Sequence, residues 1–483
     1  MGPELNRNIF RAYDIRGVAE PSSNGHLPDL NDGAVDAIGR GFAELLRHQA
    51  TGSLVIGGDN RRSTERIRGV LTKALLNAGW SVIDIGLSTS PLLYYCVAAW
   101  GAAGGVNVTG SHNPPHHNGL KLIGPGAIPI SSDEIQQIYR LATTNGFEGA
   151  AVSGTLLRRD PRDEYVTFLR DYVERKNGLV QPPFPVVVDG ANGVASLVAP
   201  DLLRSVGCEV TELYCDLDSD FPNRGLDPTD ARNLTALQSE VVTRGAKLGF
   251  AFDGDGDRVA IVDESGVMIE SEYVLILLAR DLLSRVPGAT VLYDVRCSSN
   301  VPRDIAEHGG VPYMFKSGHS LIKREMRDKR ILLGGEGSGH MFFGEEYWGV
   351  ESGILAAAKV ASILSQSETP LAEHFGNLPR MSGSPEFRIE ISDDEKFDIA
   401  KRVGVLLKEN GPTSEVDGVR VDFNGGWALV RASNTNPEII VRAEAEDRSS
   451  LRAILHSVLE AFPSSVSADA LHELRAFVGG SPT

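Results

Sequence analysis

The chain has 483 residues, 42% of them apolar and 23% charged, which is enough for about three to four domains with substantial cores. Its 64 acidic residues outnumber the 47 basic ones and give a formal net charge of -17. This charge argues against nucleic acid or a membrane surface as a partner, so an anionic ligand must be bound by local clusters of arginine and lysine.

A unit made of a short β-branched run, a polar or Gly-rich turn and a segment with helical apolar spacing recurs along most of the chain. Its predicted strands lie at residues 54–56, 106–108, 186–188, 248–252, 291–293 and 331–333. Strands that alternate with helices predict α/β layers with largely parallel sheets. Ligands bind at the carboxyl ends of such strands, where the turns would lie. The helix predicted after the first strand buries Ile67, Val70, Leu71, Ala74 and Leu75 and is capped by Gly79.

The last hundred residues follow a different pattern. Residues 419–423 and 427–431 alternate in hydropathy around the tight turn Asn424-Gly425-Gly426, and residues 438–445 predict a third strand. Helices are predicted near residues 393–409 and 448–462. We therefore expect three similar α/β domains followed by a separate α+β domain, with the divisions 1–155, 156–266, 267–378 and 379–483.

The cellular setting is indicated by the cysteines and by the apolar runs. Four cysteines without a CxxC pair or a zinc spacing favour free thiols and a reducing compartment. Residues 1–11 show no signal pattern, and the longest apolar run, near residues 274–279, is closed by Arg280. We expect a cytoplasmic protein that neither spans nor enters a membrane.

The segment from Val108 to Pro114 places Ser111 beside His112 at the end of an apolar run. A serine hydroxyl needs an activating partner or a prior modification to act covalently, so Ser111 is a candidate phosphate carrier. A polar strand-to-helix turn would use the same residue types. Both interpretations stay open from this segment alone.

Three carboxylates alternate with glycines at Asp253, Asp255 and Asp257, so that the backbone can curl and let them converge on one hard cation such as Mg²⁺. An EF-hand is the competing interpretation, because Glu264 stands at its twelfth position. Arg258, where that loop needs glycine, and the strand-like flanks oppose it. A polar turn without metal is the third interpretation.

Two further turns are candidates for ligand binding. Glu336, Ser338 and His340 alternate in a Gly-rich turn and could bind the hydroxyls of a polyol, although such a turn can also exist without a ligand. The other turn could surround a phosphate, or be an ordinary polar hairpin turn, and its polar residues are Arg431, Ser433, Asn434 and Thr435, with Arg442 on the next predicted strand. A nucleotide P-loop is not supported, because no GxxxxGK[ST] motif occurs.

Seven motifs in a fixed order make a family recognisable. The chain resembles the α-D-phosphohexomutases, and within them the bacterial phosphomannomutase/phosphoglucomutase group. The motifs are Phe10 to Gly17, Val108 to Pro114, Asn118 to Lys121, Asp253 to Arg258, Lys316 to Ser320, Glu336 to His340 and Arg431 to Pro437. The resemblance implies four domains around a central cleft: three similar mixed α/β domains and a C-terminal α+β domain of TATA-box-binding protein-like build. In chain order, these domains would bear the phosphoserine, bind the metal, bind the sugar and bind the phosphate.

The resemblance also implies the roles of individual residues. Ser111 would be the phosphoserine and, through its phosphate, would bind Mg²⁺ together with Asp253, Asp255 and Asp257. Arg16, His112 and Lys121 would surround the transferring phosphoryl group, and Arg258, Arg296 and His319 would complete the site. The residues implied to bind substrate are Tyr13, Arg296, His319, Glu336, Ser338, His340, Arg431, Ser433, Asn434, Thr435 and Arg442.

The activity implied is reversible phosphoryl transfer between the 1- and 6-positions of mannose or glucose phosphates. Phosphorylated Ser111 would donate to the free hydroxyl, and the resulting hexose 1,6-bisphosphate would turn over and return its other phosphate. Lys121 and His340 are candidates for the general base. A phosphosugar hydrolase and a non-catalytic sugar-phosphate sensor are the alternatives. The expected partners are small hexose phosphates, and the expected state is a monomer or dimer.

Overall fold

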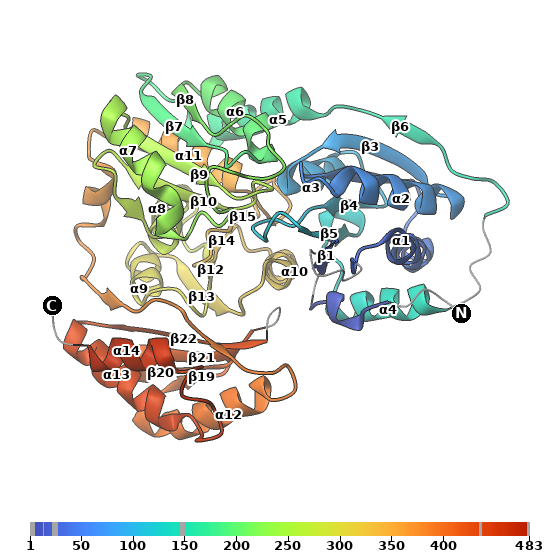
Figure 1. The fold of residues 1–483 in the computed structure, drawn as a ribbon. Coiled ribbons are helices and arrows are strands. Elements are labelled where there is room, and N and C mark those ends of the chain that lie inside the picture. Colours follow the sequence, from blue (N-terminus) through green and yellow to red (C-terminus); the bar gives the residue numbers. More distant parts are fainter. Residues whose placement is uncertain (1–4, 13, 22–27, 145–149, 434–436, 481–483) are drawn as a thin grey trace. The chain divides into compact units, whose positions relative to one another are not determined.

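The computed structural model describes residues 5–12, 14–21, 28–144, 150–433 and 437–480 (Figure 1). They form two compact units. Unit 1 comprises Met1–Val291, His308–Val311 and His319–Gly376, and unit 2 comprises Leu292–Glu307, Pro312–Gly318 and Asn377–Thr483. Within the described ranges, no helix combines the length and the apolar character that crossing a membrane requires.

The first sheet of unit 1 has the strand order β1-β5-β4-β2-β3-β6. Its strands are β1 (Ile15–Val18), β2 (Ser53–Gly58), β3 (Ser81–Leu87), β4 (Gly104–Val108), β5 (His117–Ile123) and β6 (Leu156–Arg158). β2 runs parallel to β3 and β4, whereas β5 runs antiparallel to β4 and β1. The sheet is therefore mixed: β4, β2, β3 and β6 form the parallel part that was expected, and β5 and β1 are antiparallel. Residues 109–116 are too few for a parallel crossover, so β5 has to turn back beside β4.

Helices cover both faces of this sheet. The four helices are α1 (Asp32–Arg47), α2 (Thr64–Asn77), α3 (Ser90–Ala99) and α4 (Ser132–Thr143). One apolar cluster joins α1, α2 and α4 to the inward residues of β2, β4 and β5. The predicted face of α2 is buried at Ile67, Leu71, Ala74 and Leu75. Gly79 follows the C-cap with a positive φ of 89°, as predicted for a capping glycine.

The second sheet of unit 1 has the order β11-β10-β9-β7-β8 and is also mixed. β7 is parallel to β8 and β9, but β10 is antiparallel to β9 and β11. The strands are β7 (Pro185–Asp189), β8 (Glu209–Leu213), β9 (Leu248–Phe252), β10 (Val259–Asp263) and β11 (Met268–Ile269). The helices of this region are α5 (Arg162–Asn177), α6 (Ala199–Ser205) and α7 (Thr235–Arg244).

The rest of unit 1 contains three short antiparallel strands, β14 (Leu333–Gly335), β15 (Met341–Phe343) and β16 (Val350–Glu351). The strand predicted at 331–333 begins only at its last residue. Arg330 has a φ of 55° and the Ile331 N–H donates to the Met326 carbonyl, so this backbone caps the preceding helix. The helices are α8 (Ser271–Arg285), α10 (His319–Lys329) and α11 (Gly353–Ser365).

Unit 2 contains an antiparallel sheet of order β17-β22-β21-β20-β19, with β18 also paired to β22. Its strands are β17 (Ser382–Gly383), β18 (Phe387–Glu390), β19 (Thr413–Ser414), β20 (Val419–Phe423), β21 (Gly426–Ala432) and β22 (Glu438–Ala445). α12 (Lys396–Leu407), α13 (Arg448–Ala461) and α14 (His472–Gly479) share an apolar core with one face of it. The predictions for β20, β21, β22, α12 and α13 are confirmed.

The remaining elements are α9 (Asn300–Glu307), β13 (Val311–Phe315) and β12 (Thr290–Asp294). Val295, which follows β12, belongs to a small apolar cluster with Trp427 and Leu429 of β21. This cluster lies on the sheet face that α12 and α13 leave uncovered. The short 3-10 helices are Arg7–Ile9, Pro125–Ala127, Val194–Leu197, Ala231–Leu234, Leu371–Phe375 and Lys408–Asn410.

Candidate active site

Ser111 lies in the loop that joins β4 to β5, so the segment is a strand-to-strand turn and not the strand-to-helix turn considered above. Ser111 is 2% exposed and has a φ of 50°. A left-handed conformation is unfavourable for a residue with a side chain and is found mainly where surrounding structure enforces it. The hydroxyl donates to Asp253 Oδ2 at 2.8 Å and lies 3.3 Å from His112 Nδ1.

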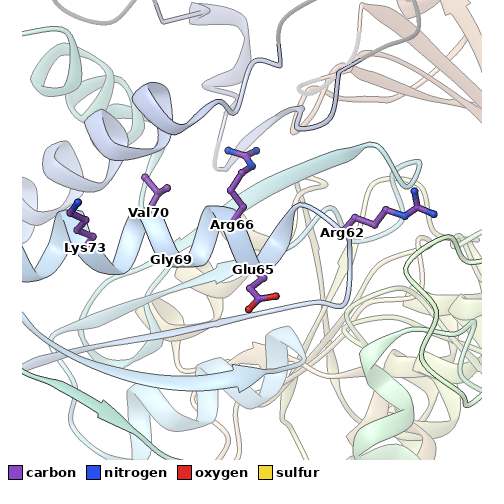
Figure 2. A pocket seen from close by; sticks show the side chains of 6 residues that line it. All are labelled: Arg62, Glu65, Arg66, Gly69, Val70 and Lys73. Carbon is purple, nitrogen blue, oxygen red and sulfur yellow. The ribbon is translucent and has the colours of Figure 1, made fainter.

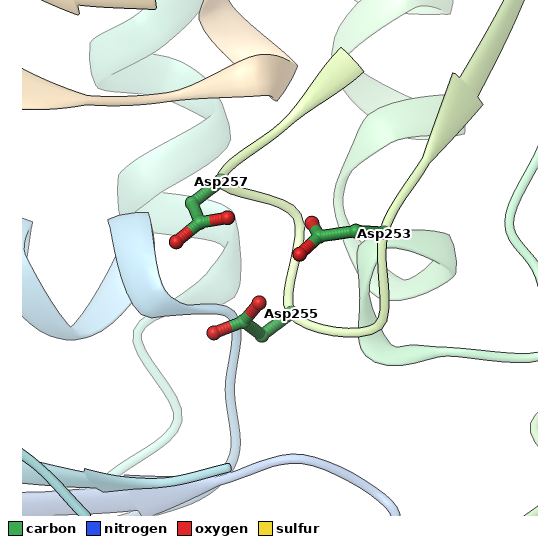
Figure 3. A group of neighbouring side chains, drawn as sticks. All are labelled: Asp253, Asp255 and Asp257. Carbon is green, nitrogen blue, oxygen red and sulfur yellow. The ribbon is translucent and has the colours of Figure 1, made fainter. Parts of the chain in front are cut away.

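The three aspartates of the metal candidate lie in the turn between β9 and β10, where Gly256 adopts a φ of 74°. Figure 3 shows the carboxylates of Asp253, Asp255 and Asp257 turned toward one another. One carboxylate oxygen of each lies within 4.8 Å of the others, and all three residues are buried. Because both flanking elements are strands, the EF-hand interpretation is wrong.

These carboxylates fit a cation. Asp255 Oδ1 is buried and accepts no hydrogen bond from the described residues. Burial and the charges of Asp257 and Asp255 raise the pKa of Asp253 well above its usual value. Crowded buried carboxylates are costly unless a positive charge compensates them, and hard cations prefer oxygen ligands. The triad can therefore hold a metal ion.

Two cationic side chains lie beside the serine and the triad. Lys121 of β5 donates to Asp255 Oδ2 at 2.7 Å and to Asp257 Oδ2 at 2.5 Å. Burial opposes the charged form of Lys121, but the two carboxylates outweigh it and raise the pKa of the amine. Arg16 of β1 donates to the Gly110 carbonyl, in the serine loop, at 2.8 Å. The positive charge of Arg258, with burial, holds the pKa of His112 well below its usual value.

The structure connects the predicted sugar-binding turn to the triad. His340 Nδ1 lies 2.8 Å from Glu336 Oε2 and 3.2 Å from Ser338 Oγ, so the three residues gather as predicted. His340 Nε2 accepts a hydrogen bond from Arg258 Nε at 3.2 Å and lies 3.3 Å from Asp257 Oδ1. Burial lowers the pKa of His340, but Asp257 outweighs it and the pKa is raised.

One buried charge beside this turn was missed by the sequence analysis. Glu351 of β16 accepts hydrogen bonds from Lys323 Nζ at 2.8 Å and Tyr94 Oη at 3.2 Å, and its Oε1 lies 3.1 Å from His319 Nδ1. The spacing of His319 and Lys323 on α10 was a weak signal for a shared partner. Glu351 itself stands outside every motif.

Four of the predicted ligand-binding residues that the structure describes lie in unit 2. Arg431 of β21 is buried, with its Nε 2.9 Å from Asp417 Oδ2, and Ser433 lies just beyond the end of that strand. The register of β21 and β22 places Arg442 on the same sheet face as Arg431. Arg296, after β12, donates to Asp294 Oδ2 at 2.6 Å and to Glu386 Oε1 at 3.3 Å. Tyr13, Asn434 and Thr435 lie outside the described residues.

A hollow of about 590 Å³ lies elsewhere, along α2 (Figure 2). No predicted site residue lines it. Its two arginines are engaged nearby, because Arg66 donates to Asp32 and Arg62 donates to Asp220. We therefore assign it no role in binding. The residues that line it are Arg62, Glu65, Arg66, Gly69, Val70 and Lys73.

Comparison with known proteins agrees with the motif order. The chain matches four consecutive phosphoglucomutase/phosphomannomutase domains: alpha/beta/alpha domain I over residues 7–149, domain II over 163–266, domain III over 270–381 and the C-terminal domain over 386–461. The chain therefore belongs to the phosphoglucomutase/phosphomannomutase family, with the expected four-domain fold. Within the family its similarity is to bacterial proteins, which confirms the resemblance drawn from the motifs.

Two curated relatives and one solved structure illustrate this similarity. The phosphomannomutase/phosphoglucomutase of Pseudomonas syringae pv. tomato is 38% identical over 458 residues, covering 94% of this chain and 95% of the relative. The phosphoglucomutase of Neisseria gonorrhoeae is 34% identical over 465 residues, covering 95% and 98%. A crystal structure of a phosphoglucomutase/phosphomannomutase family protein from Burkholderia thailandensis has a TM-score of 0.86, 32% identity and 99% coverage of both chains.

Proposed function

We propose that the protein catalyses reversible phosphoryl transfer between the 1- and 6-positions of mannose and glucose phosphates, through a phosphoserine at Ser111. The observation that carries the proposal is the buried Ser111 hydroxyl, 2.8 Å from a carboxylate of a triad able to hold a metal. The names of the two curated relatives, a phosphomannomutase/phosphoglucomutase and a phosphoglucomutase, support the same activity. A protein that only binds sugar phosphates has no need for such a carrier.

The reaction has two mirrored half-reactions. In the first, the bond from phosphorus to Ser111 Oγ breaks while a bond to the free sugar hydroxyl forms, and the hydroxyl proton passes to a base. The hexose 1,6-bisphosphate then turns over. In the second, the bond from the opposite phosphorus to its sugar oxygen breaks while a bond to Ser111 Oγ forms, and the base returns the proton to that sugar oxygen, leaving the isomeric monophosphate. Lys121 and His340, which both contact Asp257, stay the candidates for the base.

Positioning and charge neutralisation are the main needs of phosphoryl transfer. Mg²⁺ held by Asp253, Asp255, Asp257 and the Ser111 phosphate would neutralise charge that develops on the phosphoryl oxygens. Arg16 would add fixed positive charge on the serine side, and Lys121 would add positive charge there in its protonated form. His112 would also line this space, and Arg258 would keep His340 in place through their hydrogen bond.

The remaining groups would bind the substrate. We assign the sugar hydroxyls to Glu336, Ser338 and His340, because they gather in one turn that reaches Asp257. The residues assigned to the non-reacting phosphate and to the rest of the substrate are Tyr13, Arg296, His319, Arg431, Ser433, Asn434, Thr435 and Arg442. We keep the divisions 1–155, 156–266, 267–378 and 379–483 as proposed domain limits. The four free cysteines support a reducing, cytoplasmic setting.

The test is phosphorus NMR of the purified protein with Mg²⁺ and a trace of hexose 1,6-bisphosphate, supplied separately with mannose 1-phosphate and glucose 1-phosphate. We expect both 6-phosphates to accumulate, and the ratio of the rates gives the preference. Inorganic phosphate as the sole product would refute the mutase in favour of a hydrolase, and unchanged spectra would leave a sensor. Ser111→Ala is the matched control.

A further inference from the structure

A single buried arginine holds the backbone of the serine loop. Arg61, which lies just before α2 and is 2% exposed, donates hydrogen bonds to three carbonyls of the loop and to that of the first residue of β5. Its Nη2 donates to the carbonyls of Ser111 at 2.8 Å and Asn113 at 2.7 Å. Its Nη1 donates to those of Pro114 at 2.5 Å and His117 at 3.0 Å. One guanidinium thus binds four backbone carbonyls between residues 111 and 117.

The partner of this arginine is a buried carboxylate that reaches the same loop. Asp59 accepts from Arg61 Nε at 3.0 Å, from Thr109 Oγ1 at 2.8 Å and from the Gly110 N–H at 3.1 Å. The Thr109 hydroxyl in turn accepts from the Ser111 N–H at 2.9 Å. A continuous chain of hydrogen bonds therefore runs from Asp59 through Thr109 to Ser111. We call Asp59, Arg61 and Thr109 the serine clamp.

The fit of the clamp is tight. A Cβ atom at Gly110 would lie 2.4 Å from the Arg61 Cζ, so the guanidinium fills the space directly beside Gly110, the residue before the serine. Ser111 is held at a φ of 50°, a conformation that it would leave if the surroundings did not enforce it. The clamp residues are engaged with the loop and with each other. Their geometry is suited to orienting the serine.

We propose that Asp59, Arg61 and Thr109 are positioning residues that hold Ser111 in its left-handed conformation and thereby set the place of its Oγ beside Asp253. The inference rests on the proposed function, because Oγ must serve first as phosphoryl donor and then as acceptor. The same atom is used in both half-reactions, so a displaced Oγ slows both. The contacts of Arg61 and Thr109 with Ser111 are to its backbone carbonyl and N–H, so the clamp acts on Oγ through the backbone.

The experiment compares Thr109→Val, which removes the hydroxyl at nearly constant volume, with Thr109→Ser, which keeps it. Arg61→Lys keeps the charge but cannot span four carbonyls. Arg66→Lys is the matched control. Arg66 lies in the first turns of α2, close to Arg61 in the chain, but donates to carbonyls outside the serine loop. For each variant the readouts are kcat, KM, the thermal unfolding curve and the rate at which glucose 1,6-bisphosphate phosphorylates Ser111, followed by intact mass.

We expect Thr109→Val and Arg61→Lys to lower kcat and the phosphorylation rate by about 100-fold, as for a reacting atom misplaced by about 1 Å. KM should change less than about threefold, because the sugar-binding groups are untouched. Thr109→Ser should recover most of the loss, and Arg66→Lys should match the unmodified protein. If Arg61→Lys does not fold, the two Thr109 variants decide.

Wild-type kcat in a folded Thr109→Val or Arg61→Lys variant would overturn the inference. Equal losses in Thr109→Val and Thr109→Ser would also overturn it, since they would show that packing, not the hydroxyl, matters. An unmodified protein that takes no phosphoryl group from the bisphosphate would instead refute the proposed function, so the two failures are distinguishable.

Discussion

Glu351→Gln should destabilise unit 1 by about 3 kcal/mol. Glu351 is fully buried, and its Oε1 lies 2.8 Å from Lys323 Nζ, 3.1 Å from His319 Nδ1 and 3.2 Å from Tyr94 Oη. A hydrogen bond to a charged group is worth about 1 kcal/mol more than a neutral one, and three such bonds lose that increment. The sum agrees with the lower end of about 3–5 kcal/mol for breaking a buried ion pair.

The pH dependence of this effect has a definite sign. Burial opposes the ionised form of Glu351, but Lys323 and His319 outweigh it and hold the pKa of the carboxyl below its usual value. The pKa of this carboxyl is lower in the folded protein than in the unfolded one, where glutamic acid has a pKa of about 4.3. The ionised carboxyl therefore gives its full stabilisation at pH values above about 4.3. That stability is lost as the pH falls from there toward the folded pKa. The difference between Glu351→Gln and the unmodified protein should therefore be constant near neutrality and shrink in acid.

The assay is native-state hydrogen exchange of peptides from α10 and β16, which reads the free energy of opening locally. Glu346→Gln is the matched control, because that carboxylate is 57% exposed and its ion pair with Arg175 should contribute less than about 1 kcal/mol. A loss under about 1 kcal/mol for Glu351→Gln at neutral pH would refute the reasoning, as would a loss that does not change in acid.

Three further outcomes are expected. Ser111→Ala should lower mutase activity by at least about 1000-fold with an unchanged circular dichroism spectrum, and turnover near that of the unmodified protein would exclude a covalent role. Asp255→Asn should raise the Mg²⁺ concentration for half-maximal activity by about tenfold or more, because one carboxylate ligand is lost; an unchanged metal titration would remove this loop from the metal site. Arg420→Lys should destabilise unit 2 by about 1–3 kcal/mol in chemical denaturation, because the guanidinium lies 3.7 Å from the Trp427 ring centre and donates to two carbonyls. A free energy of unfolding equal to that of the unmodified protein would contradict this account of the contact.

Element positions were predictable from the sequence where side-chain pattern alone decides them. The β-branched runs at 54–56 and 186–188 became β2 and β7, and the alternating pattern after Gly418 became β20 and β21. Strand direction was harder, because it depends on the length of each connection and on which strand comes next in space. The strand predicted at 331–333 shifted because the backbone there caps α10, and hydropathy does not show this local hydrogen bonding.

The candidate site was predictable to the extent that its residues occur in compact motifs. The aspartate triad and the turn from Glu336 to His340 were found in this way, and the structure gathers each of them. Glu351, Asp59 and Arg61 were not found as supporting groups, because the site residues that they contact lie far from them along the chain, as Ser111 does from Arg61. Such residues become visible only once a fold brings their hydrogen bonds together.

Unit 2 is assembled from segments that lie far apart in the chain, and this affects when it can fold during synthesis. Val295, which follows β12, covers Trp427 and Leu429 of β21, and the carbonyls of Val295 and Cys297 accept from Arg420. During synthesis these residues leave the ribosome more than a hundred positions before the strands they cover. Folding of unit 2 therefore has to wait until the chain is nearly finished. A fragment that starts at Asn377 would expose an apolar, cation-bearing sheet face, and we expect it to aggregate.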